Sequence, residues 1–195
     1  MDNLGDDIDL IDYRDILSEP REVQFLVLRW RNSDHVRHQM LNSSIITEEE
    51  HARWLDSLSG EPKRQVVRVA HLDGVPFGVV TLKDLDRESL RCDWGMYIGE
   101  REYLGRGLAK RMLFHLMDWA FDEEGLERMY TSVVGSNVGA ISMYLKFGFK
   151  VEGRFERHIR SPQGSWEDLY WMATFREDWF GRRARMAEML DGLSG

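Results

Sequence analysis

The sequence predicts an α+β fold: a central, mostly antiparallel sheet of six or seven strands, flanked by helices and followed by a C-terminal helical extension. Three segments with strand character follow one another at 65–70, 76–82 and 92–98, as is typical of antiparallel neighbours. A glycine-bearing turn and a long amphipathic helix come next, ending near Gly125. Further strand-like and helical segments then alternate up to residue 175.

Length and composition fit one soluble globular domain. The chain has 195 residues, of which 43% are hydrophobic and 31% charged. No apolar run reaches the length of a membrane span, and the acidic first residues lack the features of a signal peptide. The single Cys92 excludes an internal disulfide. We therefore expect a cytoplasmic protein without a membrane partner.

The charge balance bears on the partners. A formal net charge of −8 disfavours nucleic-acid binding through a broad basic surface, although a local basic pocket can sit inside an acidic envelope. The histidines are scattered, without a pair four residues apart on a helix, so no metal site is expected.

The expected organisation is one domain between two shorter segments. Residues 1–21 are polar and rich in Asp, and should form a frayed lead-in. The main domain is expected over 22–175, with a C-terminal helix and tail over 176–195. Within it, the segment 24–28 fits either a strand or a short helix, because its apolar residues do not separate the two periods.

Local signals mark several boundaries. Thr47 and Glu50 have the spacing of a capping box and should start a helix. Asp73 and Gly74 are typical of a hairpin turn between two strands. The other expected elements are helices at 35–41, 140–147 and 178–190, strands at 128–134, 150–158 and 168–175, and a β-turn at 161–164.

The turn before the long helix contains Gly105 and Gly107. Glycine lets the chain turn with several backbone N–H groups pointing outward, and the helix N-terminus adds its positive end. Together these features can form a phosphate cradle. A plain strand-to-helix turn with a glycine cap fits the same residues, so both interpretations stay open.

Two blocks of the sequence resemble the GNAT (GCN5-related) N-acetyltransferase superfamily. The family turn is Gln/Arg-x-x-Gly-x-Gly/Ala, and the segment 102–107 matches it except that Glu102 replaces the first residue. A second family block appears at 137–149, in the right order and about thirty residues further on. The order of elements matches from about residue 22 to 175, and the resemblance implies the GNAT fold.

The resemblance also implies acetyl-CoA as the acyl-donor co-substrate. The thioester arm would lie along one strand as an added strand does, and the turn would hold the pyrophosphate through its backbone. Asn137 would offer an amide to the coenzyme, although it can equally cap the next helix. The cofactor-binding residues so implied are Met96, Tyr97, Ile98, Gly105, Arg106, Gly107, Leu108, Ala109 and Asn137.

Two residues are candidates for the chemistry. Tyr144 stands where many family members place a tyrosine that protonates the departing thiolate; the alternative is a core position beside Ile141 and Phe147. Asp93 is the candidate base, acting directly or through water, and would need burial to raise its pKa. A salt-bridged strand residue is the equal alternative.

Within the superfamily the chain is similar to the N-acetyltransferases of the pseudaminic acid pathway, which acetylate the 4-amino group of a UDP-linked sugar. This implies a nucleotide-sugar acceptor and leaves a homodimer open. A protein N-terminus or a polyamine is the alternative acceptor, and an acyl-CoA-binding module without turnover is an alternative of another class. The expected acceptor-binding residues are Arg31, Arg37, Thr81, Asp84, Arg157 and His158.

Overall fold

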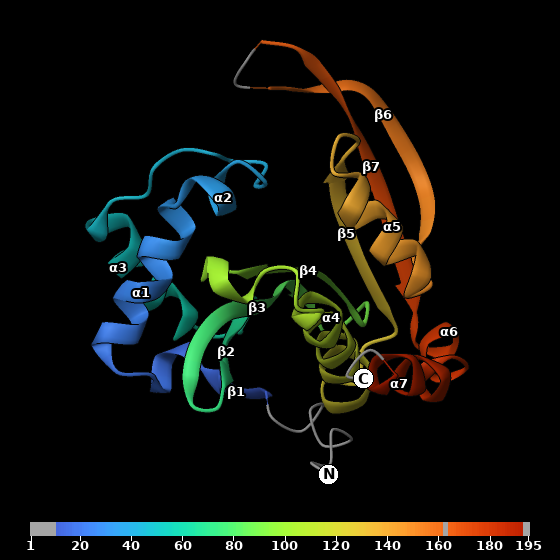
Figure 1. Ribbon diagram of the computed structural model, residues 1–195, viewed down its shortest axis with the longest axis horizontal. Helices are drawn as coiled ribbons and strands as arrows, with labels where there is room; N and C mark the ends of the chain where they lie inside the picture. The colour runs from blue at the N-terminus through green and yellow to red at the C-terminus, as the bar shows by residue number, and fades with distance from the viewer. Residues whose placement is uncertain (1–10, 162–163, 193–195) are drawn as a thin grey trace.

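The computed structural model describes residues 11–161 and 164–192, and its centre is one sheet of seven strands in the order β1-β2-β3-β4-β5-β7-β6 (Figure 1). Neighbouring strands are antiparallel except β4 and β5. The predicted α+β class is therefore confirmed. The strands are β1 (Ile11–Asp15), β2 (Val66–Leu72), β3 (Val75–Asp86), β4 (Arg91–Ile98), β5 (Arg128–Val134), β6 (Lys150–Arg160) and β7 (Trp166–Phe175).

The edge strand β1 corrects one expectation. The segment 11–21 was expected to fray, but β1 pairs with β2 along its whole length, from Ile11 opposite Leu72 onward. Its inward side chains, Ile11 and Tyr13, alternate with exposed neighbours, a period of two that is easily overlooked in so short and polar a segment. Residues 1–10 of the predicted lead-in lie outside the described residues.

Helices α1 (Arg21–Asn32), α2 (Asp34–Arg37) and α3 (Glu48–Leu58) pack beside one face of the sheet (Figure 1). The ambiguous segment 24–28 belongs to α1, whose Val27 and Trp30 are buried against Val79 and its neighbours. The predicted capping box of α3 is confirmed. Thr47 Oγ1 accepts from Glu50 N at 3.2 Å, and Glu50 Oε2 accepts from Thr47 N at 2.8 Å.

The first hairpin also forms as expected. Asp73 and Gly74 both have positive φ, 52° and 77°, which matches the twist of the two flanking strands. Strand β3 continues to Asp86, which pairs with Arg91, so it extends beyond the end predicted at residue 82.

The opposite face is covered by α4 (Leu108–Asp118), a π-helical turn (Trp119–Glu123) and α5 (Val138–Lys146). Met112, Leu113 and Leu116 of α4 are fully buried in the main core. Gly148 ends α5 in the left-handed conformation at φ 95°, as expected.

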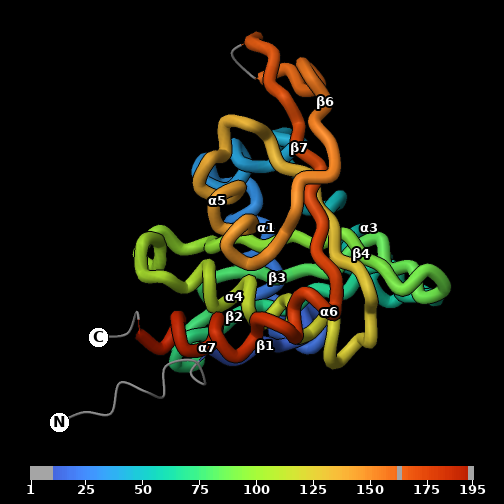
Figure 2. Tube along the Cα trace, turned by 90° about the vertical axis from the view of Figure 1, so that its right-hand side faces the viewer, coloured from blue at the N-terminus to red at the C-terminus, as the bar shows by residue number. Residues whose placement is uncertain are grey.

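The C-terminal helix predicted at 178–190 is instead two helices, α6 (Arg176–Phe180) and α7 (Arg183–Asp191). Trp179 Nε1 and Arg183 donate to the two carboxylate oxygens of Asp118 on α4, and these bonds place the two helices beside the core (Figure 2). None of the helices in the described ranges is long and apolar enough to cross a bilayer.

Candidate functional site

The point where the sheet opens is the parallel pair β4–β5. Only three residue pairs join these strands, from Arg91 opposite Arg128 to Asp93 opposite Tyr130. Beyond Asp93, β4 continues with β3 as far as Ile98, and β5 continues with β7, so the two halves of the sheet diverge (Figure 1). We call this opening the splay.

The splay leaves one edge of β4 without a strand partner in the described part of the chain. Met96, Tyr97 and Ile98, the residues expected to hold a thioester arm, all lie in this part of β4. An unpaired strand edge offers N–H and C=O groups to any extended chain that lies beside it. The edge can therefore bind a linear, amide-containing group.

The turn at the start of α4 has the properties of an anion site. Gly105 and Gly107 have φ of 76° and 78°, and an added Cβ at either would meet no atom within 4 Å. Among the described residues, no internal acceptor receives the backbone N–H groups of 105–109, whereas Lys110 N donates to Gly107 O. Unused donors at a helix N-terminus favour a phosphate, so these residues fit the pyrophosphate of a coenzyme.

The remaining coenzyme candidates lie beside this turn or at the start of α5. Arg106 is exposed and lies over the Tyr103 ring, 5.2 Å from its centroid. Leu108 is buried and anchors α4 in the main core. Asn137 Oδ1 accepts from Ala140 N at 3.2 Å, so the capping function is present. Its coenzyme contact stays a prediction.

Tyr144 is largely enclosed by aromatic rings. Trp94 meets it edge-on with ring centroids 5.0 Å apart, and Phe149 lies at 5.7 Å. Burial, together with the nearby charge of Asp93, raises the pKa of Tyr144 to about 12. The phenol therefore keeps its proton throughout the physiological range. Tyr144 thus packs in the core and also carries a proton that it can donate, so both interpretations of this residue stay open.

Asp93 lies at the last paired position before the splay. Lys83 Nζ forms an ion pair with its Oδ2 at 2.9 Å, and Oδ1 accepts from Trp94 N at 2.6 Å. Burial raises the pKa of Asp93, and Lys83 opposes that rise. Because its charge also acts on Tyr144, the structure brings the two candidate catalytic residues close together.

The residues expected to bind the acceptor come from four elements, α1, α2, β3 and β6. Arg31 donates to Asn42 O, and burial lowers its pKa. Arg37 forks onto Asp34 Oδ1 at 2.9 and 2.7 Å, so its charge is already compensated. Thr81 is half-buried and pairs with Gly95.

The other three candidates lie on two strands, β3 and β6. Asp84 is exposed at φ 50°, and its charge raises the pKa of both Asp93 and Tyr130. Arg157 and His158 lie on β6, in the hairpin that extends beyond the other strands (Figure 2). Arg157 N donates to Asp168 Oδ1 at 2.9 Å.

Sequence reasoning missed three residues beside the splay. Lys83 pairs with Asp93, Glu100 accepts from Trp30 Nε1 at 2.8 Å, and Tyr130 lies opposite Asp93. Only Lys83 carried a usable signal, because Lys83 and Asp93 lie on consecutive strands joined by a short connection, although a register shift between Lys83 and Asp86 obscures their exact pairing. The other two contacts join segments far apart in the chain.

A family model described as "Acetyltransferase (GNAT) family" matches residues 18–149. The chain is 30% identical over 122 residues to spermidine N(1)-acetyltransferase of Escherichia coli K12, covering 63% of this chain and 64% of that protein. It is 27% identical over 122 residues to the L-amino acid N-acetyltransferase AaaT of the same strain, covering 62% of this chain and 74% of that protein. The match thus spans less than two thirds of the spermidine enzyme.

Solved structures share the fold. Spermidine N-acetyltransferase from Vibrio cholerae, in complex with CoA and spermine, has a TM-score of 0.80 at 16% identity, covering 88% of this chain and 99% of that one. A further structure of a spermidine N-acetyltransferase from V. cholerae, described as dodecameric, has a TM-score of 0.72 at 17% identity over 89% of this chain and 98% of that one. At this identity the likeness supports the fold alone.

Proposed function

The chain belongs to the acetyltransferase (GNAT) family, as the sequence predicted, and we propose that it transfers the acetyl group of acetyl-CoA to a primary amine of a polyamine. The observation that carries this proposal is a half-buried carboxylate, Asp93, beside an open strand edge and a turn rich in unused amides. The names of the spermidine relatives support the acceptor class.

A polyamine replaces the nucleotide sugar as our first choice of acceptor. The sugar required uncompensated cations for its diphosphate, but Arg37 is paired with Asp34. Near the end of the β4–β5 pairing, the charges of Asp84 and Asp93 raise the pKa of Tyr130 and Arg91 opposes them. Asp93 is paired with Lys83, so exposed Asp84 is the carboxylate that we assign to a cationic acceptor. Carboxylates favour a cationic acceptor, and the relatives named above act on a polyamine or an amino acid by their names.

Acetyl-CoA supplies the activated acetyl group as a thioester. In the proposal, the amides of 105–109 hold its pyrophosphate, with Asn137 beside them. The open edge at Met96, Tyr97 and Ile98 binds the linear arm, because the arm carries amides that can replace a missing strand. These groups place the acetyl carbon at the splay, where Asp93 and Tyr144 lie near each other.

Asp93 is the proposed base for the incoming ammonium. A polyamine nitrogen reaches the enzyme protonated and must lose a proton before it can attack a carbonyl carbon. The raised pKa of Asp93 improves it as a proton acceptor, while Lys83 keeps enough of it ionised to act. The ion pair is thus part of the proposed site.

Tyr144 is the proposed donor to the departing thiolate. A thiol has an ordinary pKa of about 8.5, so full proton transfer from a phenol with a pKa of about 12 is uphill by about 5 kcal/mol. We therefore assign Tyr144 a hydrogen bond that stabilises the developing negative charge on sulfur, with transfer completed as the thiolate leaves.

The proposal is tested by thiol release from acetyl-CoA in the presence of spermidine, a UDP-linked 4-amino sugar or a peptide with a free N-terminus. Spermidine should give the highest kcat/KM. Turnover with the UDP sugar and none with spermidine would return the acceptor to the nucleotide-sugar class. Acetyl-CoA binding without turnover on any amine would instead support a binding module.

A further inference from the structure

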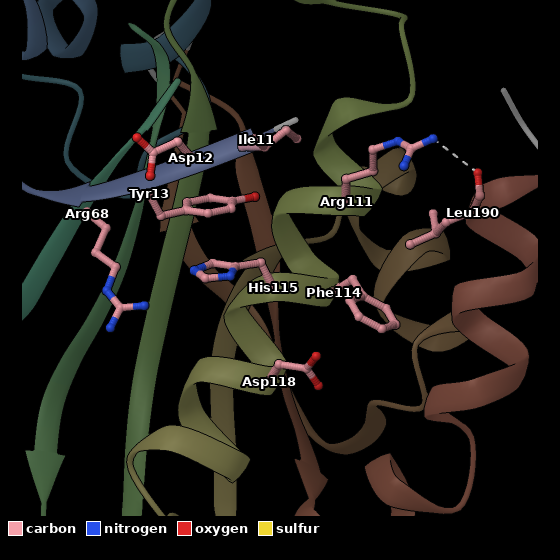
Figure 3. A pocket seen from close by; sticks show the side chains of 9 residues that line it. All are labelled: Ile11, Asp12, Tyr13, Arg68, Arg111, Phe114, His115, Asp118 and Leu190. Carbon is pink, nitrogen blue, oxygen red and sulfur yellow. Dashed lines mark hydrogen bonds between the residues drawn. The ribbon is translucent and has the colours of Figure 1, made fainter. Parts of the chain in front are cut away.

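A second concave site lies on the α4 side of the sheet, away from the splay (Figure 3). It is a cavity of about 360 Å³ between β1, β2, α4 and α7. Its lining includes none of the residues to which we assign acetyl-CoA or the amine. Volumes of this order are typical of small-molecule sites.

The cavity is built around a stacked pair of rings. Tyr13 of β1 and His115 of α4 lie face to face, with centroids 3.5 Å apart and planes 5° from parallel. His115 Nε2 is buried and has no hydrogen-bond partner among the described residues. A buried polar atom without a partner costs stability, so the position is explained if a ligand supplies the bond.

Arg68 is fixed next to this pair. Its guanidinium lies over the Trp119 ring at 4.0 Å and pairs with Glu123 at 2.8 Å. The ion pair uses one terminal nitrogen, and the planar fork carries further N–H donors. Burial and the charge of Arg68 lower the pKa of His115 to about 4, so the imidazole is neutral and Nε2 can carry a donated hydrogen.

The carboxylates of the cavity are already engaged. Asp12 pairs with Arg14 at 2.6 Å, and Asp118 accepts from Trp179 and Arg183. In Figure 3 the stacked rings lie between Arg68 and Arg111, which donates to Leu190 O at 3.2 Å.

The lining contains two arginines, Arg68 and Arg111, and two carboxylates, Asp12 and Asp118. Because both carboxylates are engaged by other side chains, Arg68 and His115 Nε2 offer hydrogen-bond donors to a ligand.

We propose that this cavity binds a small oxyanion, a carboxylate or a phosphate, held by Arg68 and His115 Nε2–H at the edge of the stacked Tyr13–His115 pair. A charged acceptor that takes two donors matches the fork of Arg68 and satisfies the nitrogen left without a partner. The site is independent of the acetyl-transfer proposal, since neither residue belongs to that machinery.

The test is calorimetric titration of the full chain with citrate and, separately, inorganic phosphate, at constant ionic strength set by sodium chloride. At least one probe should bind at millimolar concentration or below. His115→Phe, which keeps a stacking ring, and Arg68→Met, which keeps packing on Trp119, should each weaken that binding at least tenfold. Arg29→Met on the exposed side of α1 is the matched control and should bind as wild type.

A thermal melt adds a readout that tests the empty site. Without ligand, His115→Phe should raise the melting temperature, because it removes the unpaired nitrogen and keeps the ring, and it should abolish the shift that the probe produces in wild type. Both variants keep the turn at 105–109, so phosphate bound there would survive the substitutions. Binding that neither substitution weakens, or no binding of either probe, would overturn the proposal.

Discussion

The two proposed catalytic side chains, Tyr144 and Asp93, are both withdrawn from water, but different neighbours surround them. Aromatic rings enclose Tyr144 on α5, whereas a lysine on the adjoining strand compensates the charge of Asp93. Burial raises the pKa of each group. One group is thereby held protonated and the other becomes a better base, which is the division of labour that amine acylation requires.

Tyr144→Phe should lower kcat by roughly 10²-fold, the lower range for loss of a general acid, with the Kd of acetyl-CoA nearly unchanged. The substitution removes only the hydroxyl and preserves the contacts with Trp94 and Phe149. Steady-state kinetics and calorimetry give the two quantities. Tyr13→Phe, which makes the same change far from the splay, is the control. Equal turnover in wild type and Tyr144→Phe would remove Tyr144 from the mechanism.

Lys83→Met should move the acidic limb of the profile of kcat/KM against pH to higher pH. Asp93 must be ionised to accept a proton, so activity is lost as pH falls through its raised pKa. Loss of the lysine removes the interaction that lowers that pKa, and the limb therefore shifts upward. Lys150→Met, which breaks an exposed ion pair with Asp178, should leave the limb in place.

An acidic limb that stays at the same pH in Lys83→Met would show that Asp93 is not the titrating base. Asp93→Asn should remove the limb and most of the activity together.

Among the elements, the turn into α4 bears most on function. Its amides point away from the core because two glycines adopt positive φ, a conformation that other residues rarely accept. The proposed donors of this turn are main-chain N–H groups, which need no particular side chain. In the sequence, the spacing of the two glycines was therefore the only sign of the turn. For the same reason Glu102 in place of the family Gln or Arg leaves the backbone donors unchanged.

Gly107→Asp should weaken acetyl-CoA binding by at least tenfold, because a carboxylate would stand where the phosphates are proposed to lie. Gly74→Asp is a matched control, as Gly74 has nearly the same φ, 77°, and equally open surroundings in the β2–β3 turn. Both variants place an Asp at a glycine of positive φ, but only Gly107→Asp puts its charge at the proposed phosphate site. Comparing their acetyl-CoA affinities by calorimetry therefore separates the effect of local charge from that of backbone strain. Unaltered affinity in Gly107→Asp would exclude this turn as the phosphate site.

Elements with strong local signals were predicted well. The capping box at Thr47 and the hairpin at Asp73 depend on neighbouring residues only, and both formed as expected. Strand β1 and the division between α6 and α7 depend on distant partners. β1 exists because β2 offers it an edge, and Trp179 fixes α6 through Asp118, 61 positions away.

At the scale of the whole molecule, the fold class and the family could be predicted because two motifs in the right order fix the central strands and helices. The acceptor could not. Its candidate residues come from α1, α2, β3 and β6, and their relative positions follow from the packing of the whole sheet. The oxyanion cavity could not be predicted from the sequence for the same reason, since β1, α4 and α7 meet there only in the folded chain.

Global stability should fall between pH 6.5 and 4 in part because of His115. The pKa of His115 drops from 6.5 to about 4 on folding, so below pH 6.5 the unfolded chain takes up a proton that the folded one refuses. This group should cost at most about 3 kcal/mol by pH 4 and nothing above pH 7. Urea unfolding of wild type and His115→Phe at pH 7 and pH 5 measures the difference.

If wild type and His115→Phe lost equal stability between those two pH values, His115 would not be held neutral by the fold.

The central claim is that backbone amides at 105–109 capture the charged linker of coenzyme A and so direct the acetyl group to an amine at the splay. It is tested most directly by calorimetric titration with acetyl-CoA and with acetyl-pantetheine, which lacks the pyrophosphate. We predict that acetyl-CoA binds at least tenfold more tightly. Equal affinity for the two compounds, or no heat with acetyl-CoA at millimolar concentration, would contradict the account.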